Sequence, residues 1–220
     1  MVWMLNDCWP TSNWSIIDYY RRPKPAYYAA KRACATLLPI VFERRENVEF
    51  FFSNDGGTLC EAKLRFGQLH LNGDCVWTEE QSVPVGPVET VRFHTVNRTD
   101  LSLYTGDYLF VEADIGGTRL PIVTYFPDLW KEVPWPRPDV HIRLEGRTEG
   151  ENGVLTRLEV ETDSFARFCH LLIPKEAGVS WLDDNFFDLP AGMCHGVSVF
   201  SAASFPVEKV KIGTWHTDWP

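Results

Sequence analysis

The spacing of hydrophobic residues changes along the chain at Pro39. Before this proline, the stretch PAYYAAKRACATLL places apolar residues on one stripe at helical spacing, and it predicts a helix over residues 25–38. Pro25 suits the first turn of a helix, and Pro39 would end it. The apolar run MVWML at the front predicts a short strand over residues 2–5. The helical stripe consists of Tyr27, Ala30, Cys34, Leu37 and Leu38.

After Pro39, hydrophobic and polar residues alternate, which predicts β-strands with one buried face. The alternation is clear in the segments EAKLRF, VHIRLEG and RLEVE. Turn residues separate the strands, and Asn72-Gly73 is a strong hairpin signal. The other turn signals are Asp55-Gly56-Gly57, Gly116-Gly117 and Asn152-Gly153. The predicted core positions of the three segments are Ala62, Leu64, Phe66, Val140, Ile142, Leu144, Leu158 and Val160.

Short strands at this spacing, without a further helical stretch, predict a mainly β protein built from β-sandwiches. The proline-rich segment KEVPWPRPD cannot continue a strand ladder, so it marks a break. We therefore expect one immunoglobulin-like β-sandwich over residues 39–135 and a second over residues 136–220. Residues 1–38 would precede them as a strand and a helix. Because this pair cannot bury its own faces, it needs the first sandwich or a partner outside the chain.

Charge and composition narrow the range of partners. The chain has 220 residues and a net charge of −9, which repels phosphate backbones, so we expect no nucleic-acid partner. No apolar run approaches the ~20 residues of a membrane span, and the first residues do not form a signal-peptide pattern. The six widely spaced cysteines contain no Cys-x-x-Cys motif, and we expect them to be buried free thiols.

The sequence contains no pattern that predicts a complete catalytic centre. The six histidines show no metal-ligand spacing, and neither a phosphate loop nor a Gly-x-Ser-x-Gly motif occurs, so we expect no metal and no cofactor. We interpret the acidic residues Asp183, Asp184 and Asp188 as loop and turn residues, because calcium would require further oxygen ligands. Cys8 has no histidine near it in sequence, so we interpret it as a structural thiol.

Two motifs resemble a known family. The first is VWMLNDCWPTSNWSIIDYYRRPKPAYYAAKRA, and the second is DDNFFDLPAG, which runs from Asp183 to Gly192. They resemble the end of the catalytic barrel and the C-terminal immunoglobulin-like domain of glycoside hydrolase family 2, in its β-mannosidase branch. The second motif departs from the family pattern, because one residue is missing before Pro190 and Ala191 is added after it. The matching positions of the first motif are Trp3, Leu5, Asn6, Asp7, Trp9, Pro10, Trp14, Ser15, Asp18, Tyr19, Lys24, Tyr28, Ala29 and Arg32.

The resemblance implies that residues 1–38 are the last strand and helix of a (β/α)8 barrel, whose active site lies where the strands end. It places Trp3 under the sugar, with Asp7 and Trp9 at the rim of the pocket. A tryptophan face stacks on a pyranose, and a carboxylate accepts hydrogen bonds from hydroxyls. The alternative is that both tryptophans pack the barrel top and Asp7 caps a loop. The two catalytic glutamates of a retaining glycosidase would lie upstream of Met1, so the chain alone is expected to be inactive.

Three functions remain open at this point. The first is the C-terminal part of a β-mannosidase-like enzyme, whose partners would be a β-mannoside oligosaccharide and either the missing barrel or a second copy of the chain. The second is a carbohydrate-binding module that grips a polysaccharide with aromatic side chains. The third is a structural module without a sugar ligand. Exo-β-glucosaminidase or β-galactosidase activity is an alternative for the parent enzyme, although the residues NDCWP favour a mannoside.

Overall fold

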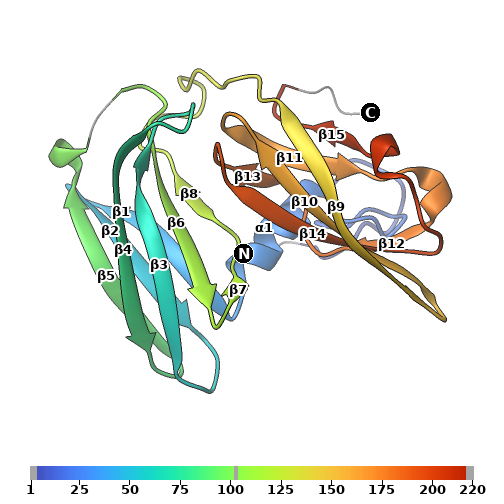
Figure 1. The fold of residues 1–220 in the computed structure, drawn as a ribbon, viewed down its shortest axis with the longest axis horizontal. Coiled ribbons are helices and arrows are strands. Elements are labelled where there is room, and N and C mark those ends of the chain that lie inside the picture. Colours follow the sequence, from blue (N-terminus) through green and yellow to red (C-terminus); the bar gives the residue numbers. More distant parts are fainter. Residues whose placement is uncertain (1–3, 102–103, 217–220) are drawn as a thin grey trace.

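The structure is a computed structural model that describes residues 4–101 and 104–216. It is mainly β, as the sequence predicts, with antiparallel strands arranged in two groups of sheets (Figure 1). The helix α1 (Pro25–Ala33) lies beside the second group and behind the sheets in this view. Within the described residues, no helix has the length and apolar character needed to cross a membrane.

The first group of strands forms two antiparallel sheets. One sheet has the order β1-β2-β5, and the other has the order β4-β3-β6-β7, with β8 also pairing with β6. The turn between β3 and β4 contains the predicted hairpin residues, and Gly73 adopts a φ of 91° there, which a side chain would disfavour. The strands are β1 (Leu37–Arg44), β2 (Asn47–Asn54), β3 (Cys60–Leu69), β4 (Cys75–Val85), β5 (Glu89–Asn97), β6 (Tyr108–Ile115), β7 (Thr118–Arg119) and β8 (Val123–Tyr125).

The second group also forms two antiparallel sheets. Their strand orders are β12-β14-β10-β9 and β13-β11-β15. The proline-rich segment between β8 and β9 contains no strand, as expected for a connection with three prolines. The strands are β9 (Val140–Gly150), β10 (Gly153–Thr162), β11 (Ala166–Leu172), β12 (Val179–Leu182), β13 (Phe187–Leu189), β14 (Cys194–Ser201) and β15 (Lys211–Gly213).

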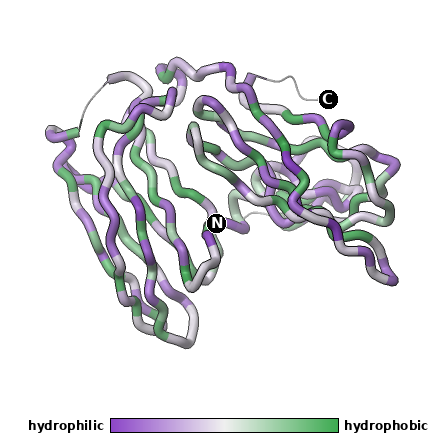
Figure 2. Tube along the Cα trace, viewed as in Figure 1, coloured by the Kyte–Doolittle hydropathy of each residue, from purple (hydrophilic) through white to green (hydrophobic). Residues whose placement is uncertain are grey.

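The alternation of hydrophobic and polar residues correctly identifies the buried faces of β3 and β10. Figure 2 shows this alternation along the strands. Ala62, Leu64 and Phe66 of β3 are buried, and so are Leu158 and Val160 of β10. The prediction for the segment 140–146 is wrong in part, because Leu144 is exposed on β9. This strand is at the edge of its sheet, so its later residues extend past the core.

The two groups of strands share hydrophobic contacts. One core cluster lies within the first group, whereas the other combines residues from both groups. Tyr108 of β6 and Phe126 each contact Phe165 of the second group, with ring centroids 4.7 Å and 5.1 Å apart. Trp135, from the proline-rich connection, lies 5.0 Å from the Phe126 ring. These contacts hold the two groups together through a continuous apolar layer.

The predicted helix over residues 25–38 is too long. The helix α1 ends at Ala33, and Leu37 begins strand β1. Cys34 donates its backbone N–H to the Ala30 carbonyl at 3.0 Å, which closes the last turn. Pro39 does not end the helix but lies inside β1, an edge strand, where its missing N–H is tolerated.

The predicted strand over residues 2–5 falls partly on residues outside the described range. Met4 and Leu5 lie outside any strand, and Asn6 forms an isolated parallel bridge with Ile17. Met4 has a φ of 66°, a left-handed conformation that interrupts an extended chain. The described half of the prediction is therefore wrong.

The expectation of buried thiols is also wrong for part of the set. All six cysteines are free, but Cys8, Cys34 and Cys75 are exposed, whereas Cys169 is buried. The exposed thiols lie in a loop, at the end of α1 and at the start of an edge strand. These are peripheral positions of the fold, so the thiols are exposed there despite the general tendency of cysteine to be buried.

Candidate functional site

The aromatic segment at the front of the chain folds into a closed loop. The Asp7 N–H donates to the Ile17 carbonyl at 3.0 Å, and the Ile17 N–H donates to the Leu5 carbonyl at 3.0 Å. The Lys24 N–H donates to the Ile16 carbonyl at 2.9 Å, which ties the start of α1 to the same point. The loop of residues 8–16 therefore begins and ends at a fixed base. We call it the aromatic loop.

Asp7 lies at the base of the aromatic loop, and its side chain is 1% exposed. The Ser15 hydroxyl donates to Asp7 Oδ1 at 2.6 Å, and the Lys24 ammonium donates to Asp7 Oδ2 at 2.7 Å. The hydrogen bonds from Lys24 and Ser15 lower the pKa of the Asp7 carboxyl below its usual value, against the opposing effect of desolvation. Asp7 is therefore held as a carboxylate, paired with the Lys24 ammonium.

The aromatic loop exposes large rings to solvent. Trp9 is 67% exposed and Trp14 is 82% exposed. Further apolar side chains of the same segment are exposed beside them in sequence, namely Met4, Leu5, Tyr19 and Tyr20. A concentration of exposed aromatic residues of this kind is typical of a surface that contacts a ligand or another part of a protein.

Of the three predicted site residues, Trp3, Asp7 and Trp9, the two that the structure describes do not share one environment. Trp3 lies outside the described residues, Trp9 is exposed on the loop, and Asp7 points into the base of the loop. The hydrogen bonds of Asp7 match the expected alternative, in which it stabilises a loop. The contacts of Trp3, Asp7 and Trp9 with a sugar stay predictions.

Helix α1 docks on the second group of strands rather than on the first, so that expectation is corrected. Arg32 Nη1 pairs with the Asp184 carboxylate and donates to the Asn185 carbonyl at 3.1 Å. Its Nη2 donates to the Phe186 carbonyl at 2.9 Å. Tyr28, rather than the predicted Tyr27, is the buried residue of the helix, and its ring lies 5.9 Å from that of Phe186.

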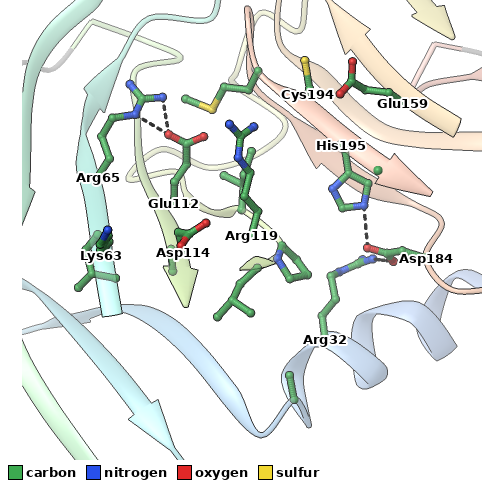
Figure 3. A pocket seen from close by; sticks show the side chains of 18 of the residues that line it. Arg32, Lys63, Arg65, Glu112, Asp114, Arg119, Glu159, Asp184, Cys194 and His195 are labelled. Carbon is green, nitrogen blue, oxygen red and sulfur yellow. Dashed lines mark hydrogen bonds and ion pairs between the residues drawn. The ribbon is translucent and has the colours of Figure 1, made fainter. Parts of the chain in front are cut away.

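A cleft of about 1080 Å³ lies between the two groups of strands and α1 (Figure 3). Arg65 pairs with Glu112 on one wall, and on the other His195 Nε2 lies 3.1 Å from Asp184 Oδ2, the carboxylate that also binds Arg32. No Trp, Tyr or Phe is among the described residues that line this cleft. Its ion pairs are characteristic of an interface between elements, and the described part of its lining contains no aromatic platform for a sugar.

The aspartates of the second motif make structural contacts. Asp183 and Asp184 lie between β12 and β13, as their interpretation as loop and turn residues predicts, whereas that interpretation is wrong for Asp188, which lies in strand β13. Asp183 accepts a hydrogen bond from the Ser198 N–H at 2.7 Å. Asp188 pairs with Arg167 at 2.8 Å, and it also accepts the Phe168 N–H at 3.1 Å. Burial raises the pKa of Asp188, whereas the charge of Arg167 opposes this shift. Among the described residues, no group of three or more His, Cys, Asp or Glu side chains is placed to hold a metal ion.

The sequence did not indicate that two arginines, Arg32 and Arg167, organise these contacts. Arg32 reaches Asp184 across 152 positions of the chain, and Arg167 reaches Asp188 across 21. The only available signal was that Arg32 is the last matching position of the first motif and that Asp184 and Asp188 belong to the second. A pairing between two motifs cannot be inferred from their positions alone, because it depends on how the whole chain folds.

No family model matches the chain. In sequence, it is 66% identical to β-mannosidase B of Aspergillus niger over 48 residues, which are 21% of this chain and 5% of that protein. It is 46% identical to β-mannosidase B of Emericella nidulans over 54 residues, which are 24% of this chain and 6% of that protein. The matched segment is thus a small fraction of the length of these curated relatives.

The similarity to solved structures extends over almost the whole chain. A β-D-mannosidase from Dictyoglomus thermophilum matches 97% of this chain and 26% of its own, with a TM-score of 0.83 and 24% identity. The exo-chitosanase of Amycolatopsis orientalis matches 98% of this chain and 30% of its own, with a TM-score of 0.71 and 16% identity. The resemblance to the C-terminal part of a family 2 β-mannosidase, expected from two motifs, is therefore confirmed in a short stretch of sequence and, as a fold, along nearly all of the chain.

Proposed function

We propose that this chain is the C-terminal accessory portion of a β-mannosidase-like retaining glycoside hydrolase that removes terminal β-D-mannose from oligosaccharides. In this proposal, residues 1–38 are the last strand and helix of the catalytic barrel. Residues 39–135 and 136–220 are two immunoglobulin-like sandwiches that brace it. The observation that carries the proposal is the 66% identity to a fungal β-mannosidase B over 48 residues.

The chain's contribution to the sugar pocket is one wall. Trp3 would lie under the sugar with its flat face against the ring, and Asp7 and Trp9 would lie at the rim of the pocket. The high exposure of Trp9 and the closed base of the aromatic loop support this role, because a rigid loop keeps its rings in place without a ligand. The acid and the nucleophile would come from the rest of the barrel.

The chain by itself is expected not to hydrolyse a β-mannoside, because one wall of a pocket cannot supply the pair of carboxylates that a retaining glycosidase requires. The measurement is the release of nitrophenol from p-nitrophenyl β-D-mannoside by the purified chain, compared with a mock preparation. Turnover above the mock level, abolished by substituting a carboxylate of this chain, would contradict the assignment as an accessory portion.

The competing proposal, a carbohydrate-binding module, predicts a different result. The exposed tryptophans of the aromatic loop could grip a polysaccharide without any barrel. Calorimetric titration with mannobiose or mannan distinguishes the two, since saturable binding that depends on Trp9 would favour a binding module. A p-nitrophenyl β-glucosaminide assay of the assembled parent enzyme tests the sister activity suggested by the fold match to an exo-chitosanase.

A further inference from the structure

We propose that Lys24 is the positioning residue of the sugar-facing wall: its ammonium holds Asp7 and both ends of the aromatic loop in one fixed arrangement. The inference rests on the proposed function for the identity of the ligand. The arrangement itself is a property of this chain and can be measured without any sugar. Lys24 is a matching position of the first motif, but the motif does not indicate what its side chain contacts.

The Lys24 ammonium donates hydrogen bonds to three groups at the two ends of the aromatic loop. Its Nζ donates to Asp7 Oδ2 at 2.7 Å, to Ser15 Oγ at 2.9 Å and to the Asn13 carbonyl at 3.1 Å. These three contacts use all three donors of an ammonium group. One partner precedes the aromatic loop and the other two belong to its second half, so the lysine crosslinks the two ends. The Lys24 side chain is 25% exposed and that of Asp7 is 1% exposed, so removal of the lysine would leave a buried carboxylate without its counter-ion.

The backbone of Lys24 is fixed as well. It lies between Pro23 and Pro25 and has φ −85° and ψ 165°, the extended conformation that the following proline favours. Ile17 forms an isolated bridge with Pro23, and α1 starts at Pro25. The side chain of Lys24 is therefore presented to Asp7 from a restrained base, and less conformational entropy is lost when its hydrogen bonds form.

This arrangement connects the second sandwich to the exposed tryptophans. Arg32 anchors α1 to the loop at Asp184, Lys24 at the front of α1 anchors the aromatic loop, and the loop carries Trp9 and Trp14. Such a chain of contacts positions a binding surface from outside it, which is the role of supporting residues in preorganised sites. The sandwich would thus influence sugar binding without touching the sugar.

The pH dependence follows from the lowered pKa of Asp7. A carboxyl with a lower pKa in the folded state than in the unfolded state adds stability that is present above its unfolded pKa. That stability is lost as the pH falls through the lowered folded value. The groups packed around the Asp7 carboxylate are the Lys24 ammonium and the Ser15 hydroxyl, and both donate hydrogen bonds to it, so protonation of Asp7 weakens the contacts at the base of the loop.

The test uses Lys24→Met in the full chain, with Lys24→Arg as the conservative variant. The matched control is Arg21→Met, a nearby exposed cation. Two quantities are measured: the pKa of the Asp7 carboxyl by ¹³C NMR, and hydrogen exchange at the Asp7 and Ile17 amides. We expect Lys24→Met to raise that pKa to or above its ordinary value and to speed exchange at both amides by at least about tenfold. Lys24→Arg is expected to retain a lowered pKa, and Arg21→Met to change neither quantity.

The outcome that overturns the proposal is specific. If Lys24→Met leaves the Asp7 pKa low and the two amides protected, or if Arg21→Met has the same effect, Lys24 does not position the loop. If Lys24→Arg fails to keep the pKa low, the ionic part of the proposal is wrong. Ser15→Ala provides a second check, because it removes one donor to Asp7 and should raise its pKa in the same direction. Failure of the mannosidase assignment would leave all these results unchanged, so the two proposals can fail separately.

Discussion

Replacing Arg167 with Met is expected to lower the free energy of unfolding by about 3–5 kcal/mol, the usual cost of breaking one side of a buried ion pair. The Arg167 side chain is 4% exposed and lies 2.8 Å from the Asp188 carboxylate. The Asp188 carboxylate, which is 19% exposed, would keep the Phe168 N–H and the Thr124 hydroxyl as its remaining donors. Met fills most of the volume of the aliphatic part of arginine, so the loss reflects charge more than a cavity.

Aromatic stacking adds to the cost of this substitution. The Arg167 guanidinium lies 4.0 Å from the Trp130 ring, 4.4 Å from Phe168 and 4.8 Å from Trp135. A cation over several rings gains attraction from each of them, and the two tryptophans come from the connection between the sandwiches. Loss of Arg167 should therefore loosen the connection as well as the second sandwich.

Urea unfolding measures the effect, and a double variant separates its causes. In Arg167→Met/Asp188→Leu no buried charge is left, so we expect it to be more stable than Arg167→Met alone. If the single variant lost less than about 1 kcal/mol, the pair would be behaving as an exposed ion pair, contrary to its burial.

Replacing Arg32 with Ala is expected to release helix α1 from the second sandwich. A helix of nine residues is unstable by itself, so it depends on tertiary contacts. Arg32 supplies three of these contacts, to the Asp184 carboxylate and to the carbonyls of Asn185 and Phe186. We expect hydrogen exchange of the α1 amides to accelerate by about 100-fold, with little change in the strands.

The matched control for this prediction is Lys31→Ala. Lys31 is the neighbouring cation on the helix and donates to a single backbone carbonyl, that of Asp183. Lys31→Ala should accelerate hydrogen exchange of the α1 amides much less than Arg32→Ala does. Arg32→Lys should have an intermediate effect, because lysine cannot reproduce the forked geometry of the guanidinium group. Equal effects of Lys31→Ala and Arg32→Ala would show that general charge, rather than the Arg32 contacts, holds the helix.

Strand identity was predictable because it depends on local alternation. The buried faces of β3 and β10 follow directly from the residues at alternate positions, and Asn72-Gly73 forms the expected hairpin. The helix boundary was not predictable in the same way. Leu37 and Leu38 fit the helical stripe, but in the fold they pair with Asn54 and Ser53 of β2, and this tertiary pairing outweighs their helical spacing.

The candidate site was predictable only as a segment. The motif drew attention to Asp7 and Trp9, and both lie at the aromatic loop. Their different surroundings could not be read from the motif, because the partners of Asp7 are eight and seventeen residues away, at Ser15 and Lys24. The ion pair between Arg32 and Asp184, which holds α1 on the second sandwich, joins residues still farther apart in sequence. It depends on where the fold places the helix relative to that sandwich.

Complementation of a shortened relative tests directly whether this chain completes a β-mannosidase. This chain would be expressed together with a fungal β-mannosidase B that has been shortened just before the segment matched here, and the purified mixture assayed on p-nitrophenyl β-D-mannoside. We expect the two polypeptides to associate and hydrolysis to require both, with Trp9→Ala reducing kcat/KM and Arg32→Ala weakening the association. If the chain folds as described but neither binds the shortened enzyme nor restores its activity, it is not the C-terminal portion of a β-mannosidase.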